Sequence, residues 1–436
     1  MKFSSALELI KAKINKHQNK GNIQPKMQNQ FDDLLRHIKE LRPDLKESFV
    51  LALLMDDKKY ITYYQDVKDS GLSGVYHYYN YGYKEGRDFF EPNFRAITKA
   101  PLNTKGGSVI FFDTIKTNAS FLYRGYFPQI RNNSAIILHQ NSTIHEIIAA
   151  IFSAKEMIFI RPSNGSSKTK FYIKLCKALN VRVIIDMDDL LLPEFAELKG
   201  AIRSGISDYD QIFNDLTRDS SIFLAADQMV CSTQAIAKLH SELIKDIKVS
   251  RNRLPLEYFI ERKAVEEKPI NKKVKILYLS GSRTHLKDYS SISGPLLKLA
   301  QNHPEQFSLS FLGMLSDQTS IFTHLKVECN FLPLVEFSDM LSEIKKHDLV
   351  LVPLEKTVFN NAKSNIKFIE AASQGVAVIA SAVTEYISCI ENEKNGWVCD
   401  TESEWYDTLS HLIYNPEKIH SASLKAYDSA IEGYSV

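Results

Sequence analysis

The sequence has few cysteines, no long apolar run and no excess of one charge. Its five cysteines are scattered over 436 residues without the spacing of a zinc or redox motif, so neither a disulfide scaffold nor a cysteine-bound metal is expected. The sequence has no run of about 18 consecutive apolar residues and no apolar signal core, so neither a membrane span nor secretion is expected. We therefore expect a cytoplasmic protein. The 54 Lys and Arg balance 52 Asp and Glu, which disfavours nucleic-acid binding.

Residues 1–100 differ from the rest and predict a mainly helical, aromatic-rich module. At its start, apolar side chains recur at helical spacing opposite lysines: Phe3, Ala6, Leu7, Ile10 and Ile14 against Lys2, Lys13, Lys16 and Lys20. Such a helix either lies on an anionic membrane surface or docks on protein, and its short apolar face without Trp favours docking. The tyrosine-rich stretch 76–87 either stacks on bases or sugars or forms a small core closed by Gly82 and Gly86, and we favour the core.

The remaining chain alternates short apolar runs with helix-length segments, the pattern of parallel strands covered on both faces. The expected strands are Ser108–Phe112, Ala135–Leu138, Met157–Ile160, Val181–Ile185, Gln228–Cys231, Val274–Leu279, Ser308–Leu312, Leu349–Val352, Val376–Ala380 and Trp397–Cys399. Charged residues 261–273 read as a linker. The sequence thus predicts an α/β protein: the module, then Rossmann-like domains over 105–260 and 270–436, facing a cleft.

The first strand of the second series runs into a small, basic turn. Gly281 and Ser282 let backbone amides approach a ligand, and Arg283 and Lys287 supply charge for a phosphate. An ordinary strand-to-helix connection explains this segment alone equally well. It is not a Gly-x-Gly-x-x-Gly or Walker loop, which disfavours NAD-dependent redox chemistry and ATP hydrolysis.

A second constellation lies at residues 361–375. A helix beginning near Ser364 would present the amides of Ser364 and Asn365 beside Lys363, which is an anion site, with Glu370 further along to accept ribose hydroxyls. The alternative is that Lys363, Lys367 and Glu370 form ordinary charge pairs on a solvated helix face.

In the first series, a buried strand ends in Asp186, Asp188 and Asp189, where a carboxylate can orient an acceptor hydroxyl or act as a base. Helix capping by Asp188 or Asp189 is the structural alternative. Arg124 and Arg161 are candidates for an anionic acceptor or phosphate, or else ion-pair residues.

Together, the turn at 281–287 and the segment 363–370 resemble the nucleotide-sugar half of GT-B glycosyltransferases, family 4-like, of the kind found in bacterial O-antigen and capsule synthesis. The resemblance spans about Ser108 to Tyr434 and implies that Gly281, Ser282, Arg283 and Lys287 bind the diphosphate and that Glu370 binds the ribose. The first glutamate of the family's Glu-x7-Glu motif falls at Ala362, which has no carboxylate for the sugar. His285 either approaches the phosphates or donor sugar or is a structural loop histidine.

The resemblance implies a hexosyl- or deoxyhexosyltransferase that moves a sugar from a nucleoside diphosphate sugar to a bacterial surface glycan or lipid-linked acceptor. Retention of configuration and no essential metal or other cofactor are expected. The N-terminal module is a candidate for contacts with the inner membrane or a polysaccharide-assembly complex. Alternatives are a metal-dependent GT-A enzyme using Asp186-Met-Asp188 and a noncatalytic nucleotide-sugar or glycan-binding subunit. The sequence ends near where GT-B enzymes cross back to the first domain, so a fragment of a longer protein is also considered.

Overall fold

The computed structural model describes residues 28–90, 92, 103, 105–113, 119–132, 135–139, 141–163, 165–281, 283–314 and 320–436. The helix expected over Phe3 to Ile14 lies outside the described residues, as does Ser282. By their contacts the residues group into two compact units. The first unit takes residues 1–115, 133–186 and 221–229, and the second takes 116–132, 187–220 and 230–436.

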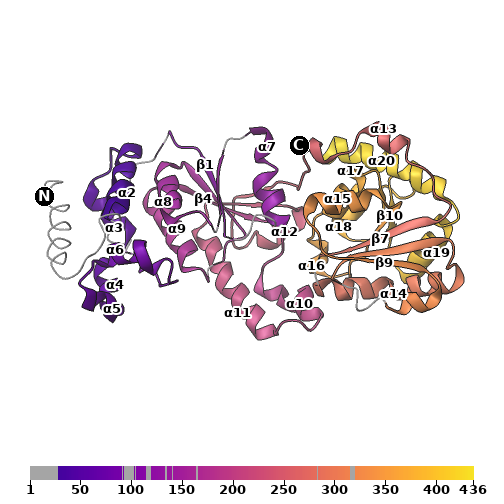
Figure 1. The fold of residues 1–436 in the computed structure, drawn as a ribbon, viewed down its shortest axis with the longest axis horizontal. Coiled ribbons are helices and arrows are strands. Elements are labelled where there is room, and N and C mark those ends of the chain that lie inside the picture. Colours follow the sequence, from indigo (N-terminus) through magenta and orange to yellow (C-terminus); the bar gives the residue numbers. More distant parts are fainter. Residues whose placement is uncertain are drawn as a thin grey trace. The chain divides into compact units, whose positions relative to one another are not determined.

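Two six-stranded sheets form the framework, in the orders β2-β1-β3-β4-β5-β6 and β12-β11-β10-β7-β8-β9 (Figure 1). The strands of the first are β1 (Ser108–Phe112), β2 (Ala135–His139), β3 (Glu156–Ile160), β4 (Arg182–Met187), β5 (Gln228–Cys231) and β6 (Ile247–Val249). Those of the second are β7 (Val274–Ser280), β8 (Phe307–Gly313), β9 (Glu328–Leu332), β10 (Leu349–Val352), β11 (Ala377–Ser381) and β12 (Trp397–Cys399). The α/β class with two Rossmann-like sheets is therefore confirmed.

All ten expected strands are present, and β6 and β9 are the two that the sequence did not indicate. Both lie at a sheet edge without a fully buried residue, and Lys248 in β6 and Asn330 in β9 interrupt the apolar run by which the others were recognised.

Helices surround both sheets. Before the first sheet come α2 (Gln28–Leu41), α3 (Glu47–Leu54), α4 (Asp57–Tyr63), α5 (Gln65–Ser70), α6 (Gly74–His77) and η2 (Tyr78–Gly82). Among its strands lie η4 (Phe121–Tyr126), α7 (Gln129–Asn132), α8 (Ile144–Ser153), α9 (Ser167–Ala178), η5 (Pro193–Leu198), α10 (Gly200–Arg203), α11 (Tyr209–Ser220), η6 (Ser221–Ala225) and α12 (Gln234–His240). The rest are η7 (Leu256–Tyr258), α13 (Arg262–Glu266), η8 (Arg283–His285), α14 (Leu286–Asn302), η10 (Ser320–Leu325), α15 (Phe337–Lys345), α16 (Val358–Asn361), α17 (Ile366–Ser373), α18 (Thr384–Cys389), α19 (Glu402–Leu412) and α20 (Pro416–Tyr434).

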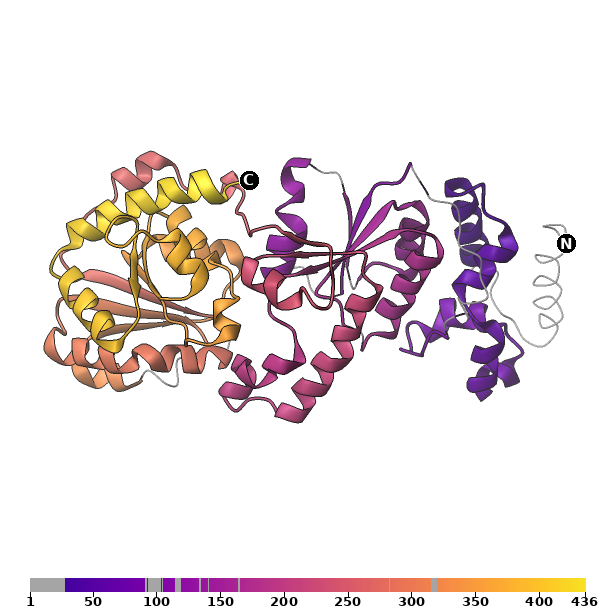
Figure 2. The same ribbon diagram turned by 180° about the vertical axis from the view of Figure 1, so that it is seen from behind.

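The second sheet is apolar on both faces because successive side chains of a strand point to opposite sides. Val274, Ile276 and Tyr278 of β7 pack with residues of α14 and α19. Leu277 and Leu279 point the other way and pack with residues of α15, α17 and α20. Figures 1 and 2 show α14 and α20 on opposite sides of this sheet. This two-sided cover fixes the end of β7, where the expected phosphate turn begins.

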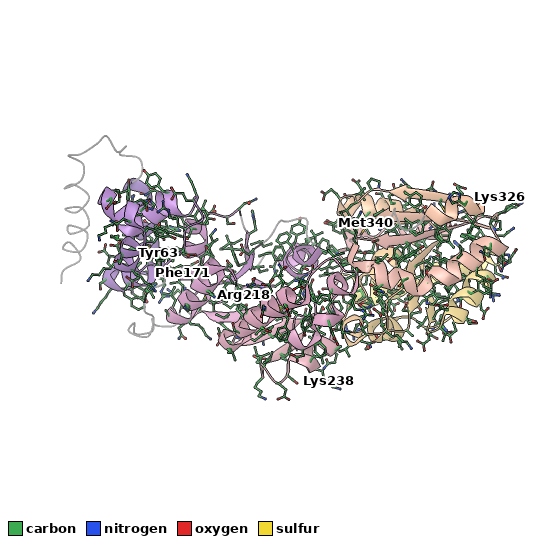
Figure 3. All side chains as sticks on the ribbon, turned by 90° about the horizontal axis from the view of Figure 1, so that it is seen from below. Tyr63, Phe171, Arg218, Lys238, Lys326 and Met340 are labelled. Atoms are coloured by element: carbon green, nitrogen blue, oxygen red, sulfur yellow. The ribbon has the colours of Figure 1, made fainter. Side chains whose placement is uncertain are left out.

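The tyrosine-rich stretch of the N-terminal module is a core, as favoured from the sequence. Tyr60 and Tyr78 are fully buried, and the Tyr60 hydroxyl lies 3.1 Å from Nδ1 of His77. The module packs on the first sheet's helices: the rings of Phe89 and Phe171 of α9 lie 4.2 Å apart between centroids, and Figure 3 labels Phe171 among the surrounding side chains.

The stretch expected as a linker, residues 261–273, is not a free connection. It contains the helix α13, in which Val265 is fully buried and Arg262 donates to the carboxylate of Asp428 on α20 at 2.8 Å. The charged composition reflects ion pairs on a packed helix rather than solvated chain. Within the described part of the chain, no helix combines the length and apolarity needed to cross a membrane.

Replacing Gly82 by alanine is expected to destabilise the N-terminal module. The added Cβ would lie 2.3 Å from the Tyr60 hydroxyl, which is itself held by His77. Overpacking of this kind costs about 1–3 kcal/mol in the free energy of unfolding, to be measured by urea denaturation. Gly433→Ala is the matched control, because its Cβ would meet no described atom within 4 Å and alanine favours a helix. Equal stability of the two variants would contradict this account.

Candidate functional site

The end of β7 carries the small, basic turn expected from the sequence. Ser280 is buried, Gly281 is exposed, and the chain continues into η8 and α14 with Arg283 and Lys287 exposed. A Cβ at Gly281 would meet no described atom within 4 Å, so the fold itself does not require glycine there. The turn therefore presents two cations and an uncrowded backbone at the carboxyl end of a central strand.

The helix expected from about Ser364 begins two residues later, at Ile366, with Asn365 as its N-cap. The backbone carbonyl of Asn365 accepts from the amides of Phe368 and Ile369, which closes the first turn. Ala362, at the position of the absent glutamate, is 1% exposed, and its carbonyl accepts from the hydroxyl of Thr233 at 2.9 Å. The Ala362 methyl group is thus buried rather than turned toward a ligand.

The structure brings these two segments together, although about 80 residues separate them in sequence. The ammonium of Lys367 donates to the carbonyl of Leu279 in β7 at 3.0 Å. Lys363 lies 3.7 Å from the carboxylate of Asp288 in the first turn of α14. Burial lowers the pKa of Lys367 to about 8, with the charge of Lys363 adding to the effect. The alternative that these lysines form charge pairs on a solvated helix face is therefore wrong.

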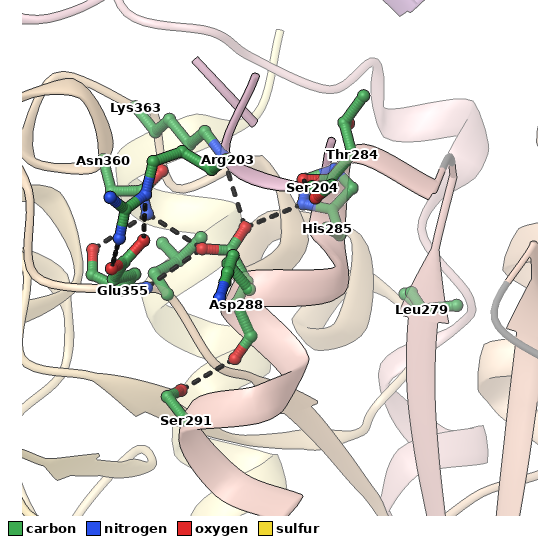
Figure 4. A network of polar contacts seen from close by, with 12 residues as sticks. Arg203, Ser204, Leu279, Thr284, His285, Asp288, Ser291, Glu355, Asn360 and Lys363 are labelled. Atoms are coloured by element: carbon green, nitrogen blue, oxygen red, sulfur yellow. Dashed lines mark hydrogen bonds and ion pairs between the residues drawn. The ribbon is translucent and has the colours of Figure 1, made fainter. Parts of the chain in front are cut away.

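Asp288 is the residue that sequence reasoning missed at this site. Its carboxylate accepts from Nδ1 of His285 at 2.9 Å and from Nδ2 of Asn360 at 2.8 Å (Figure 4). Burial by itself raises the pKa of Asp288, but the hydrogen bond from His285 and the charge of Lys363 outweigh it and bring the pKa to about 2. The spacing of three residues between His285 and Asp288 is a signal from which this contact could have been predicted.

His285 is held by this carboxylate rather than free in the loop. Burial lowers its pKa below the usual value, and the hydrogen bond to Asp288 only partly opposes that effect. The imidazole is therefore neutral near pH 7, and because the Asp288 carboxylate accepts, the proton lies on Nδ1.

The helix α10 packs against the same turn. Arg203 donates two hydrogen bonds to the carboxylate of Glu355, and the one from Nε is 3.1 Å long. Ser204 donates its hydroxyl to the carbonyl of Thr284 at 3.3 Å. The first contact fixes the side chain of Glu355, whose amide donates to Asp288, and the second fixes the carbonyl of Thr284 in the turn before Asp288 (Figure 4).

Glu370, expected to accept ribose hydroxyls, is 6% exposed and accepts from the hydroxyl of Tyr123 at 2.9 Å. Burial raises the pKa of Glu370 to about 7, even though the hydrogen bond from Tyr123 and the charge of Lys367 lower it. Tyr123 lies in η4, a single turn of π-helix, a form found frequently at functional sites.

The same turn of chain also reaches the start of α17. Arg124 is 7% exposed and donates to the carbonyl of Ser250 at 2.6 Å and to Oδ1 of Asn252 at 3.0 Å. Nδ2 of Asn252 in turn donates to the hydroxyl of Ser364 at 2.9 Å. Arg124, expected as an anion-binding or ion-pair residue, thus supports the candidate phosphate segment through Asn252.

The acidic residues at the end of β4 and just after it differ in exposure. Asp186 is 5% exposed, and its carbonyl accepts from the amide of Arg161, which has a positive φ of 44°. Asp188 and Asp189 are partly exposed, and Oδ1 of Asp189 accepts from the amide of Leu190. Neither caps a helix, because the N-cap of η5 is Leu192. Among the described residues, no group of three or more His, Cys, Asp or Glu side chains is arranged to hold a metal ion.

Comparisons with known proteins find likeness in structure alone. No family model matches the chain, and no curated protein does. The structure of Anabaena HepE in complex with UDP-glucose is similar at a TM-score of 0.54 and 12% identity, over 76% of this chain and 96% of that one. Sucrose-phosphate synthase from Thermosynechococcus elongatus is similar at 0.50 and 10% identity, over 76% and 95%. The fold is therefore that of the GT-B class, as expected.

Replacing Glu370 by glutamine is expected to remove part of the pH dependence of stability. The pKa of Glu370 is about 7 in the folded chain against an ordinary value of 4.5, so the folded state is favoured below pH 4.5 and that advantage is lost as the pH rises through 7. Between pH 5 and 8 the wild type should lose up to about 3 kcal/mol relative to Glu370→Gln, measured by urea denaturation. The exposed Glu417→Gln serves as control. Parallel profiles for wild type and Glu370→Gln would contradict the burial of this carboxyl group.

Proposed function

We propose that this protein is a glycosyltransferase that transfers a sugar from a nucleoside diphosphate sugar to a glycan acceptor. The proposal rests on one observation: two segments that are distant in sequence lie together at the end of β7. Lys367 contacts Leu279, and Lys363 contacts Asp288. One segment brings Arg283 and Lys287, and the other brings the start of α17. Binding of a diphosphate needs several hydrogen-bond donors and positive charges close together, and these two segments supply them.

The cations give the site its proposed chemistry. As the sugar departs, negative charge develops on the diphosphate, and Arg283, Lys287 and Lys363 neutralise it without an essential metal. The uncrowded backbone at Gly281 allows the phosphates to approach closely. Ser364 and Asn365 lie at the start of α17, whose amide groups favour an anion.

Glu370 is proposed to accept ribose hydroxyls. An ionised carboxylate has about four lone-pair sites, of which the Tyr123 hydroxyl uses one. One of Asp186, Asp188 and Asp189 is proposed to orient the acceptor hydroxyl, and transfer is proposed to retain the sugar's configuration.

The donor and acceptor classes follow from likeness and resemblance. HepE is recorded with UDP-glucose, which makes UDP-sugars the first donors to test. The acceptor proposed is a bacterial surface glycan, O-antigen or capsule, built on the cytoplasmic side of the inner membrane. The N-terminal module is proposed to mediate contacts there.

A nucleoside diphosphate is expected to stabilise the chain against heat. A panel of UDP, GDP and dTDP at 100 times the dissociation constant should add about 2.7 kcal/mol for the one that binds. The double variant Arg283→Ala/Lys287→Ala should lose most of that gain in stability, because it removes both exposed cations of the turn. Lys263→Ala, an exposed lysine on α13, should keep it. No shift with any nucleotide would count against the proposal, and binding without transfer to any acceptor would favour a noncatalytic subunit.

Transfer is expected to continue in excess EDTA. In the proposal the charge on the diphosphate is neutralised by side chains, so removing divalent cations should leave the rate within about twofold, as measured by release of the nucleoside diphosphate. Loss of activity that Mn²⁺ or Mg²⁺ restores would instead favour a metal held by Asp186 and Asp188.

A further inference from the structure

We propose that Asp288 is a positioning residue of the donor site, whose buried carboxylate turns His285 and Lys363 toward two different parts of the donor. The inference rests on the proposed function, since it says how this site meets a nucleoside diphosphate sugar. Asp288 is outside the residues assigned by resemblance, and what singles it out is the way its two oxygens are used.

The first oxygen is fixed by the fold. Oδ1 accepts from the backbone amide of Glu355 at 2.9 Å and from Nδ2 of Asn360 at 2.8 Å. Asn360 is itself anchored, because Nδ2 also donates to the carbonyl of Glu355 at 2.8 Å. Arg203 in turn holds the Glu355 side chain by two hydrogen bonds. The plane of the carboxylate is therefore set before any ligand arrives.

The second oxygen faces the candidate site. Oδ2 accepts from Nδ1 of His285 at 2.9 Å and lies 3.7 Å from the ammonium of Lys363. The Asp288 side chain is 8% exposed, whereas those of His285 and Lys363 are 23% and 24% exposed. A buried anion thus holds two partly exposed groups that come from different segments (Figure 4).

The hydrogen bond decides what His285 can recognise. With its proton on Nδ1 and directed at Asp288, the imidazole offers only the lone pair of Nε2. That lone pair accepts from a hydroxyl group and repels a phosphate oxygen. His285 therefore meets a sugar hydroxyl, and Lys363 remains for the diphosphate. The sequence left open whether His285 meets the phosphates or the donor sugar, and its hydrogen bond to Asp288 favours the sugar.

The chain offers a matched control for Asp288. Asp339 occupies the third position of α15, as Asp288 does of α14, and it is exposed. Both aspartates lie in the first turn of a helix, near its positive end. The variants Asp288→Asn and Asp339→Asn therefore differ mainly in the contacts to His285, Lys363, Asn360 and Glu355.

The first experiment needs no ligand. In ¹⁵N-histidine spectra of the full chain at pH 7.5, with the His285 signals assigned from His285→Gln, the wild type and Asp339→Asn should show the Nδ1–H tautomer. Asp288→Asn should shift His285 toward the Nε2–H tautomer. An unchanged His285 tautomer in folded Asp288→Asn would overturn the proposal.

The second experiment measures binding of whichever of UDP, GDP and dTDP stabilises the wild type most. Calorimetry should show about tenfold or greater loss of affinity for Asp288→Asn and for Lys363→Gln, and no change for Asp339→Asn. The double variant Asp288→Asn/Lys363→Gln should bind no more weakly than Lys363→Gln, because Asp288 acts on the nucleotide through Lys363.

The two proposals fail in different ways. A wild type that binds none of the three nucleotides would refute the proposed function. Wild-type binding that survives Asp288→Asn unchanged would refute the positioning role alone. Should Asp288→Asn not fold, Lys363→Gln still decides, since full affinity in that variant would leave Asp288 with no phosphate-binding cation to position.

Discussion

Lys367 reaches from the first turn of α17 to the carbonyl of Leu279, and the rest of the candidate site depends on this contact. It attaches the start of α17 to the end of β7, the strand that leads into the turn before α14. Lys363 then comes within 3.7 Å of the carboxylate of Asp288, in the helix that follows the turn at Gly281. The contact carries a cost, since burial lowers the pKa of Lys367 to about 8, and the ammonium remains the main form at neutral pH only because that value stays above 7.

Around that contact the polar residues fall into a supporting part and a presenting part. Arg203, Glu355 and Asn360 hold backbone and carboxylate in place, and their polar atoms are largely used within the chain. Arg283 and Lys287 remain exposed. Such a division is what preorganised binding of a diphosphate requires, because the ligand then does not have to order the groups that receive it.

The sequence predicted ten strands because most of them are apolar runs, and it missed β6 and β9 because Lys248 interrupts the first and Glu328 and Asn330 interrupt the second. It also singled out Arg283, Lys363 and Glu370 as candidate site residues. It did not predict that Asp288 collects four contacts, because three of its partners lie at least 67 residues away along the chain. Nor did it predict the bond from Tyr123 to Glu370, whose partners are separated by 247 residues. Pairings over such distances leave no periodic mark in a single sequence.

The hydrogen bond between Tyr123 and Glu370 has a consequence for how this fold is divided. The second unit is not a contiguous stretch of chain, since η4 and the residue after it, which lie between β1 and β2 in sequence, contribute Tyr123 and Phe127 to the apolar cluster around α17. A piece cut at residue 270 would lose both rings and expose apolar residues of this cluster. Moving the second unit into another protein therefore requires residues 116–132 and 187–220 together with 230–436, as three pieces rather than one.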